Sequence, residues 1–289
     1  MTRSSDMAAL DRAEAALAQK DYRATHTECI EVLKRNPRSA HAFFLLGVLA
    51  ADHGNHKKAA ELFDKALTLA PENGRYEAWH GRSLLALDQR EEAIAAAQRA
   101  SRCPNLSAST WDAIGVIYSM AGLHQDAVPC YRKALAIAPD TPSYWFNLGA
   151  GEQFLGHFDA ARAAYRKVLS LDVAHVKAWS SLAQLKNGLD QDRDLEDLTL
   201  LFEQLSNPDD RLNIGHALAM LSEETGDSKA AMAWLKRAKA GKRATIGYTR
   251  KTDLDLFKAA RTTCFRDTPS PGHTDAAPIF IIGLPRTGT

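Results

Sequence analysis

The sequence predicts an all-α fold, a right-handed solenoid of about seven stacked helix pairs over residues 1–245. Three residue types lead to this fold class, because glycine, alanine and tryptophan each recur every 34 residues. The recurring residues are Gly47, Gly81, Gly115 and Gly149, then Ala59, Ala93, Ala127 and Ala161, and lastly Trp111, Trp145 and Trp179. A fixed period of roughly 20 to 50 residues is typical of proteins in which each unit stacks on its neighbours.

The unit 108–141 shows why each repeat is expected to fold as two helices. Its first half places residues at the spacing of one helical face: Trp111, Ile114, Gly115 and Tyr118. Gly122 is the expected turn, and Pro139 ends a second helix whose inward face holds Ala127 and Tyr131. Small residues let the two helices approach closely. Neither helix can bury its apolar face alone, so the units must stack.

Seven units of this kind follow one another along the chain. They span 6–39, 40–73, 74–107, 108–141, 142–175, 176–209 and 212–245. The first and the sixth are irregular, since Thr25 stands where alanine is usual and the pattern is lost after Gly188. The third unit has Asp88 at the turn position.

This pattern resembles the tetratricopeptide repeat, a helix–turn–helix unit of 34 residues. The resemblance covers about four-fifths of the chain and implies a concave surface formed by the first helix of each unit. The positions that it places there are His41, Phe44, Val48, Arg75, Ala78, Arg82, Ser109, Asp112, Val116, Met120, Ser143, Phe146, Ala150 and Phe154. The predicted contacts of a protein or peptide partner are Phe44, Arg75, Arg82, Phe146 and Phe154.

Two interpretations of those five residues stay open. Aromatic residues at helical spacing are more often core than ligand contacts, and exposed arginines are more often solvated than bound. The family's carboxylate clamp for chaperone tails needs a recurring Lys/Asn/Arg set. Only Asn147 matches its asparagine, and the corresponding residues elsewhere are Leu45, Trp79, Ala113 and Ser181. The resemblance therefore implies a partner other than a chaperone tail.

Composition excludes several other classes of protein. The 289 residues are 45% hydrophobic and 25% charged, as in ordinary globular chains, and the net charge of +1 gives no field that favours nucleic acid or a membrane. The four cysteines are widely spaced, and the histidines near the turns do not converge, so neither a disulfide framework nor a metal site is expected. Charged residues interrupt the N-terminus, so no signal peptide is predicted and a cytoplasmic location is expected.

A basic segment follows the last repeat. Residues 236–266 hold ten lysines and arginines against Asp253 and Asp255, a local net charge of +8 in a chain whose total is +1. Thr252 followed by Asp255 resembles a capping box and predicts a short helix to about Phe265. We assign 246–277 to this basic helix and a linker rich in proline and small polar residues. The cluster attracts an anion or forms a solvated helix surface, and the second is the commoner case.

The last residues predict the start of an α/β domain over 278–289. Pro278 precedes the apolar run 279–282, which is typical of a strand buried in a parallel sheet. The glycines of the next seven residues have the spacing of a phosphate loop, whose backbone N–H groups hold an anion. Thr289 stands where a nucleotide hydrolase has lysine, which argues against an ATPase or GTPase.

This ending resembles sulfotransferases that use 3′-phosphoadenylyl sulfate (PAPS). Bacterial proteins with tetratricopeptide repeats ahead of such a domain form a known family, and the resemblance here covers only the last dozen residues. It implies that the donor phosphosulfate is bound by Gly283, Leu284, Pro285, Arg286, Thr287, Gly288 and Thr289. The implied reaction transfers a sulfuryl group to a hydroxyl of a protein tyrosine or a sugar. The catalytic base is expected beyond Thr289, so these 289 residues alone are expected to be inactive.

A different class of function stays open. The chain is alternatively a non-catalytic tetratricopeptide scaffold that mediates protein–protein interaction, needs no cofactor and has a functionally silent tail. The codons that follow residue 289 would separate the two interpretations.

Overall fold

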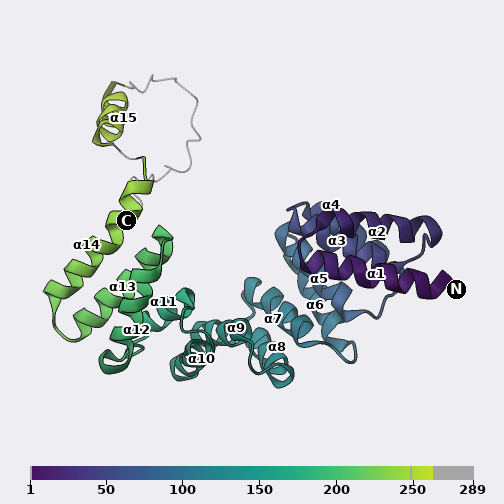
Figure 1. The fold of residues 1–289 in the computed structure, drawn as a ribbon, viewed down its shortest axis with the longest axis horizontal. Helices are drawn as coiled ribbons and strands as arrows, with labels where there is room; N and C mark the ends of the chain where they lie inside the picture. The colour runs from purple at the N-terminus through teal and green to yellow at the C-terminus, as the bar shows by residue number, and fades with distance from the viewer. Residues whose placement is uncertain (1, 248, 263–289) are drawn as a thin grey trace, which may run out of the picture. The chain divides into compact units, whose positions relative to one another are not determined.

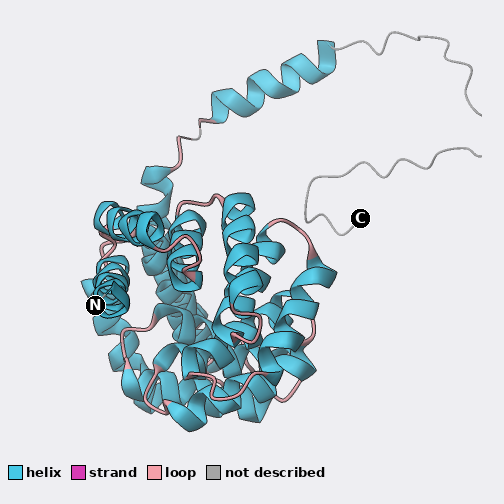
Figure 2. Ribbon diagram, turned by 90° about the vertical axis from the view of Figure 1, so that its right-hand side faces the viewer, coloured by secondary structure: helices cyan, strands magenta, loops and turns pink. Residues whose placement is uncertain are grey.

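A computed structural model describes residues 2–247 and 249–262, and every regular element within those ranges is an α-helix (Figures 1 and 2). Fourteen helices form seven consecutive pairs, which confirms the predicted helical repeat fold. The pairs are α1 (Thr2–Ala18) with α2 (Tyr22–Arg35), α3 (Ala40–Asp52) with α4 (His56–Leu69), α5 (Gly74–Ala86) with α6 (Arg90–Arg102), α7 (Ala108–Met120) with α8 (His124–Ile137), α9 (Pro142–Phe154) with α10 (Phe158–Leu171), α11 (Val176–Ala183) with α12 (Gln191–Gln204), and α13 (Pro208–Glu224) with α14 (Ser228–Thr245). None of the described helices is both long and apolar enough to cross a bilayer.

Consecutive helices pack side by side within the compact unit formed by residues 1–243. In each of the first five pairs the two helices contact each other, and the second helix contacts the first helix of the next pair. The first helices of successive pairs also touch, for example α5 with α7. One surface of the array is therefore formed by odd-numbered helices, as the repeat predicts.

The turns between paired helices repeat a left-handed backbone conformation. Positive φ angles occur in register at Lys20, Gly54, Asp88, Gly122 and Gly156, each 34 residues after the one before. Glycine adopts this conformation without steric cost, and aspartate tolerates it better than most residues. The predicted turn at Gly122 and the aspartate at the third turn thus have the same backbone geometry.

In three pairs, α3 with α4, α7 with α8 and α9 with α10, the helices meet at a glycine covered by an aromatic ring. A Cβ atom added to Gly115 would lie 2.5 Å from the Tyr131 ring, and one added to Gly149 would lie 2.7 Å from the Tyr165 ring. The third pair has Ala97 at the corresponding position, and Ile117 of the next pair approaches Gly81 instead. The predicted close approach is therefore made by ring-on-glycine contacts in the pairs that have a ring.

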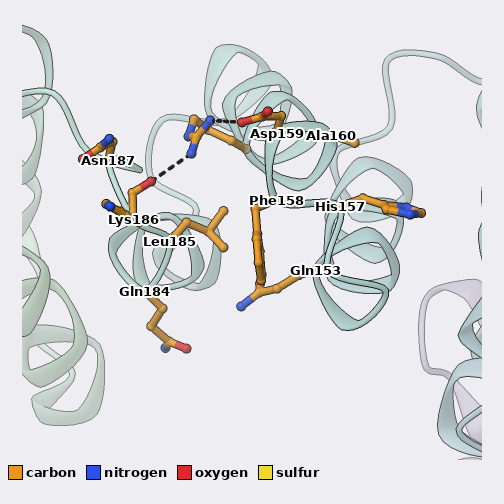
Figure 3. A pocket seen from close by; sticks show the side chains of 11 residues that line it. Gln153, His157, Phe158, Asp159, Ala160, Gln184, Leu185, Lys186 and Asn187 are labelled. Atoms are coloured by element: carbon orange, nitrogen blue, oxygen red, sulfur yellow. Dashed lines mark hydrogen bonds and ion pairs between the residues drawn. The ribbon is translucent and has the colours of Figure 1, made fainter.

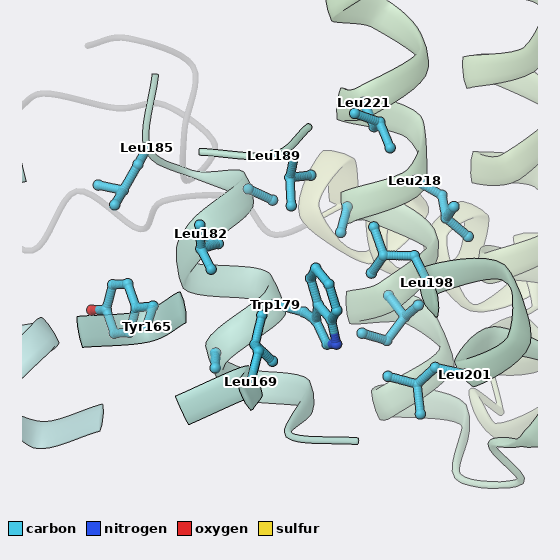
Figure 4. Close-up of a cluster of buried hydrophobic side chains, with 14 of the residues drawn as sticks. Tyr165, Leu169, Trp179, Leu182, Leu185, Leu189, Leu198, Leu201, Leu218 and Leu221 are labelled. Carbon is cyan, nitrogen blue, oxygen red and sulfur yellow. The ribbon is translucent and has the colours of Figure 1, made fainter. Parts of the chain in front are cut away.

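Three clusters of buried apolar side chains run along the array, centred on α1–α5, α5–α9 and α10–α13. In the third cluster the Trp179 indole lies among leucines such as Leu182 and Leu198 and is 2% exposed (Figure 4). Its Nε1 donates a hydrogen bond of 2.7 Å to the Val173 carbonyl oxygen. The sixth unit therefore keeps a dense core.

The irregularity predicted after Gly188 is a shortened helix. α11 ends at Ala183, and the chain runs through a left-handed residue, Asn187, to the start of α12. The buried Asp194 carboxylate fixes this connection, because it accepts hydrogen bonds from Arg166 Nη1 at 2.5 Å and from the Asp190 backbone N–H at 2.8 Å. A side chain at Gly188 would clash with the Leu182 carbonyl group.

The second unit, 244–289, contains helix α15 (Arg250–Thr262). Its predicted cap is misplaced by three residues, because the Thr249 hydroxyl accepts a hydrogen bond from the Thr252 backbone N–H at 3.3 Å. Thr249 is thus the N-cap, and the Thr252–Asp255 pair lies within the helix. The predicted linker from residue 263 onward, the strand 279–282 and the loop 283–289 lie outside the described residues.

Replacing Trp179 with alanine is expected to lower the free energy of unfolding by about 3–5 kcal/mol, because it empties a dense cluster. Trp145→Ala is the matched control, one repeat earlier. Its indole makes the same kind of hydrogen bond, to the Pro139 carbonyl oxygen at 2.6 Å, but is only partly buried, so a smaller loss is expected. Urea unfolding followed by circular dichroism compares them, and equal losses would contradict the burial argument.

Candidate partner-binding site

Phe44 was predicted to contact a partner on the surface, but the structure places it in the core. Its side chain is 0% exposed and stacks on Tyr76 with ring centroids 4.6 Å apart. The guanidinium of Arg75 covers the ring at 4.7 Å from its centroid. Phe44 therefore packs between consecutive units, which is the alternative that the sequence left open.

Arg75 and Arg82 line a cleft of about 300 Å³ between α5 and α7. The full lining is Arg75, Ala78, Trp79, Arg82, Ser109, Thr110, Asp112, Ala113 and Val116. Residues three, four and seven positions apart share one face of a helix, which brings these side chains to the contact of the two first helices. Six of them were placed on the binding surface by the repeat pattern. Trp79 was not predicted to lie on this surface, because the sequence singled it out only as the residue at the position of the asparagine of the carboxylate clamp.

The two arginines of the cleft differ in how they are held. Arg75 Nη2 forms an ion pair with Glu14 Oε1 of α1 at 2.6 Å. Burial raises the pKa of Glu14, but the hydrogen bond and the charge of Arg75 outweigh it, so the net shift is downward. Arg82 stacks on the Trp79 ring at 4.8 Å from the centroid and, within the described part of the chain, makes no ion pair. Arg82 is therefore the cation that a ligand can reach.

Asp112 supplies a carboxylate to the opposite wall of the cleft. It is half-buried and accepts a hydrogen bond of 2.8 Å from Asn147 Nδ2. Burial raises its pKa, while that hydrogen bond and the more distant charge of Arg82 act in the other direction. Among the described residues Asp112 has no salt-bridge partner. A half-buried carboxylate without a salt bridge lowers the stability of the fold, and carboxylates of this kind are common in binding sites.

Phe146 and Phe154 lie outside this cleft. Phe146 is half-buried, with its ring 5.7 Å from that of Tyr165 and 5.3 Å from that of His175, so it packs between units. Phe154 is 73% exposed and stacks flat on His124 at 4.2 Å. Met120, one period before Phe154 and also exposed, continues the α7 face beyond Val116.

The loop 283–289, with Arg286, lies outside the described residues, so its geometry adds nothing to the cleft. Within the described residues, no group of three or more His, Cys, Asp or Glu side chains is placed to hold a metal ion. Burial raises the pKa of the Cys29 thiol to about 12 and that of the Cys130 thiol to about 11, so both stay protonated at neutral pH.

Models of the tetratricopeptide repeat match residues 7–74, 108–141 and 142–175. Among curated proteins, the chain is 28% identical over 109 residues to superkiller complex protein 3 of Mus musculus, covering 37% of this chain and 7% of that protein. It is 23% identical over 221 residues to anaphase-promoting complex subunit 3 of Schizosaccharomyces pombe, covering 75% of this chain and 31% of that protein. The chain therefore spans less than a third of these relatives.

Solved structures of similar fold include PilF of Pseudomonas aeruginosa, with a TM-score of 0.57, 17% identity and coverage of 80% of this chain and 98% of that one. PilW, described as a type IV pilus biogenesis factor, gives a TM-score of 0.55, 17% identity and coverage of 87% and 98%. At this identity the likeness shows the fold alone. Every segment that the repeat models match lies inside the helical array.

Replacing Asp112 with asparagine is expected to make the protein more stable at pH 7, since it removes a partly desolvated charge and keeps the acceptor for Asn147. Burial raises the pKa of Asp112, so the folded chain holds this proton more tightly than the unfolded chain. Between the two pKa values, the wild type loses stability as pH rises. The advantage of the variant should therefore grow from about pH 4 to pH 7 in urea unfolding. A variant less stable at pH 7 than at pH 4, relative to wild type, would contradict this.

Proposed function

We propose that these tetratricopeptide repeats form a non-catalytic scaffold that binds a segment of a partner polypeptide in the cleft between α5 and α7. The matched repeats make a helical scaffold suited to protein–protein interaction. The observation that supports the cleft is an exposed Arg82, stacked on Trp79, opposite an Asp112 without a salt bridge. Both groups are polar and held in place, and neither has its charge neutralised by a close partner.

The chemistry of the cleft indicates the kind of segment it binds. A cation on one wall and a carboxylate on the other suit a peptide with an acidic and a basic group a few residues apart. The floor is formed by the small side chains of Ala78 and Ala113, and the exposed Ser109 hydroxyl adds a polar contact. A volume of about 300 Å³ is at the lower end for ligand pockets, so one or two side chains fill it.

The cleft also has the composition of an interaction hot spot. Tryptophan and arginine dominate such sites, because a large rigid ring and a planar cation give much contact area at low entropic cost. The Trp79 ring orients the Arg82 guanidinium before any ligand arrives. Exposed Met120 and Phe154 are proposed as flanking apolar contacts on the same first-helix surface.

Peptides selected from a random 12-residue library on the 289-residue chain are expected to bind about tenfold more weakly to Arg82→Ala, because Arg82 is the reachable cation. Arg193→Ala, which removes an exposed arginine of α12, is the matched control and should leave affinity unchanged. Isothermal titration calorimetry measures both. Selected peptides that bind Arg82→Ala and Asp112→Asn as tightly as the wild type would refute the cleft.

A second candidate rests on the sequence of 279–289 alone, which resembles the phosphosulfate loop of PAPS-dependent sulfotransferases. Under it, the array is the substrate-binding arm of a sulfotransferase whose catalytic base lies beyond Thr289. The gene sequence after codon 289 tests this directly. An α/β pattern of about 200 residues that begins with a helix would support it, and a stop codon would refute it.

A further inference from the structure

A second cavity, of about 800 Å³, lies beside the sixth repeat and away from the α5–α7 cleft (Figure 3). One wall is the turn between α9 and α10 with the first residues of α10. The other wall is the connection 184–187 that follows α11. Figure 3 shows the Phe158 ring between Gln153 on one side and Leu185 on the other.

The cavity exists because α11 is too short. Its counterpart one repeat earlier, α9, runs to Phe154, so a full-length α11 would run to residue 188. It ends instead at Ala183, and residue 188 is a glycine that packs against the Leu182 carbonyl group. The connection 184–187 therefore replaces the end of the helix and forms a wall of the cavity beside α10.

The previous repeat, in which α9 has its full length, shows which side chains meet at the corresponding position. There His124, the first residue of α8, stacks on Phe154, the last residue of α9, with ring centroids 4.2 Å apart and planes at 1°. The pair one period later is Phe158 and residue 188. Residue 188 is a glycine that lies beyond the end of α11, and among the described residues the Phe158 ring has no ring-stacking partner and is 54% exposed. A flat aromatic ring is thus the group that is missing here.

The walls of the cavity are held in place without a ligand. Arg162 Nη1 contacts Asp159 Oδ1 at 2.6 Å, and its Nη2 donates to the Lys186 carbonyl oxygen at 2.8 Å, which ties α10 to the connection 184–187. The Tyr165 hydroxyl donates to Gln153 Oε1 at 2.8 Å, which fixes that carboxamide at the mouth. A site ordered in advance loses little entropy on binding.

We infer that this cavity binds an aromatic side chain of a partner polypeptide, which stacks on Phe158 as Phe154 stacks on His124 in the previous repeat. The carboxamide groups of Gln153 and Gln184, on opposite walls, are suited to hydrogen bonds with the main chain of the bound segment. The ring of Phe158 is the exposed apolar surface that the aromatic group covers, and Leu185, which is 3% exposed, backs the cavity from the core. The site is independent of the α5–α7 cleft, so either can fail without the other.

The minimal probe is N-acetyl-L-tryptophanamide, an aromatic side chain with two peptide groups, and N-acetyl-L-leucinamide is its aliphatic control. Each is titrated into the 289-residue chain carrying ¹³C-labelled leucine methyl groups. The tryptophan probe should shift the Leu185 methyl signals with a dissociation constant on the order of 1 mM. The leucine probe should bind about three to ten times more weakly.

Phe158→Ala is the test variant, and Phe257→Ala is the matched control, because Phe257 is a similarly exposed phenylalanine on α15 (60% against 54%). Phe158→Ala should weaken the tryptophan probe about three- to tenfold, while Phe257→Ala and Arg82→Ala should not. Three results would overturn the inference. They are unchanged binding of the tryptophan probe to Phe158→Ala, equal binding of the leucine probe, and no shift of the Leu185 methyl signals up to 20 mM probe (about twenty times the expected constant). Since Phe158 is exposed at a helix start, its replacement leaves the core intact, and unshifted methyl signals of buried leucines away from the cavity, such as Leu45 and Leu218, report folding.

Discussion

Three of the seven helix pairs depend on the close approach of their helices at a glycine covered by an aromatic ring. A Cβ atom at Gly47, Gly115 or Gly149 would lie 2.5–2.7 Å from the nearest ring atom of Phe63, Tyr131 or Tyr165, a distance that no side chain tolerates. This contact sets the separation of the two helices and so sets where the next pair can stack. Where the ring is absent, at Ala97, the next unit supplies Ile117 instead. The repeat therefore sets the separation of the paired helices, and different side chains can pack at their contact.

Both candidate sites lie at positions where the repeat does not require a side chain to pack against the paired helix. The first helices must be apolar where they meet their pair, but their outward positions vary, and α5 and α7 place Arg82, Trp79 and Asp112 there. The sixth repeat departs further, because it loses part of a helix and keeps its core through Trp179 and the buried Asp194. Stability is shared among nearest neighbours in such arrays, so a local departure does not spread.

The period of 34 residues was enough to predict seven helix pairs, their turns and the irregular sixth unit. It was not enough to predict burial, because a helical face can be covered by a neighbouring unit that the period does not describe. Phe44 is hidden by Tyr76 and Arg75 of the next unit, and Trp179 is more buried than Trp145 because α12 and α13 surround it. The N-cap of α15 was missed because Thr249 and Thr252 present the same side chain. The link between Asp112 and Asn147 joins residues 35 positions apart and shows only in three dimensions.

The charges of the α5–α7 cleft also explain why two similar arginines have different roles. Arg75 is paired with Glu14 and covers Phe44, so displacing it would expose a core ring and leave the partly buried Glu14 carboxylate with only His41 as a partner. Arg82 is exposed and stacks on Trp79, so under the proposed function a ligand can pair with it without breaking an ion pair or the ring contact. Asp112 and Arg82 form no ion pair, although the charge of Arg82 acts to lower the pKa of Asp112. In the proposed function each of them meets the opposite charge of a ligand. In the proposed function the selectivity of the cleft therefore falls on Arg82 and Asp112, while Arg75 keeps the cleft in shape.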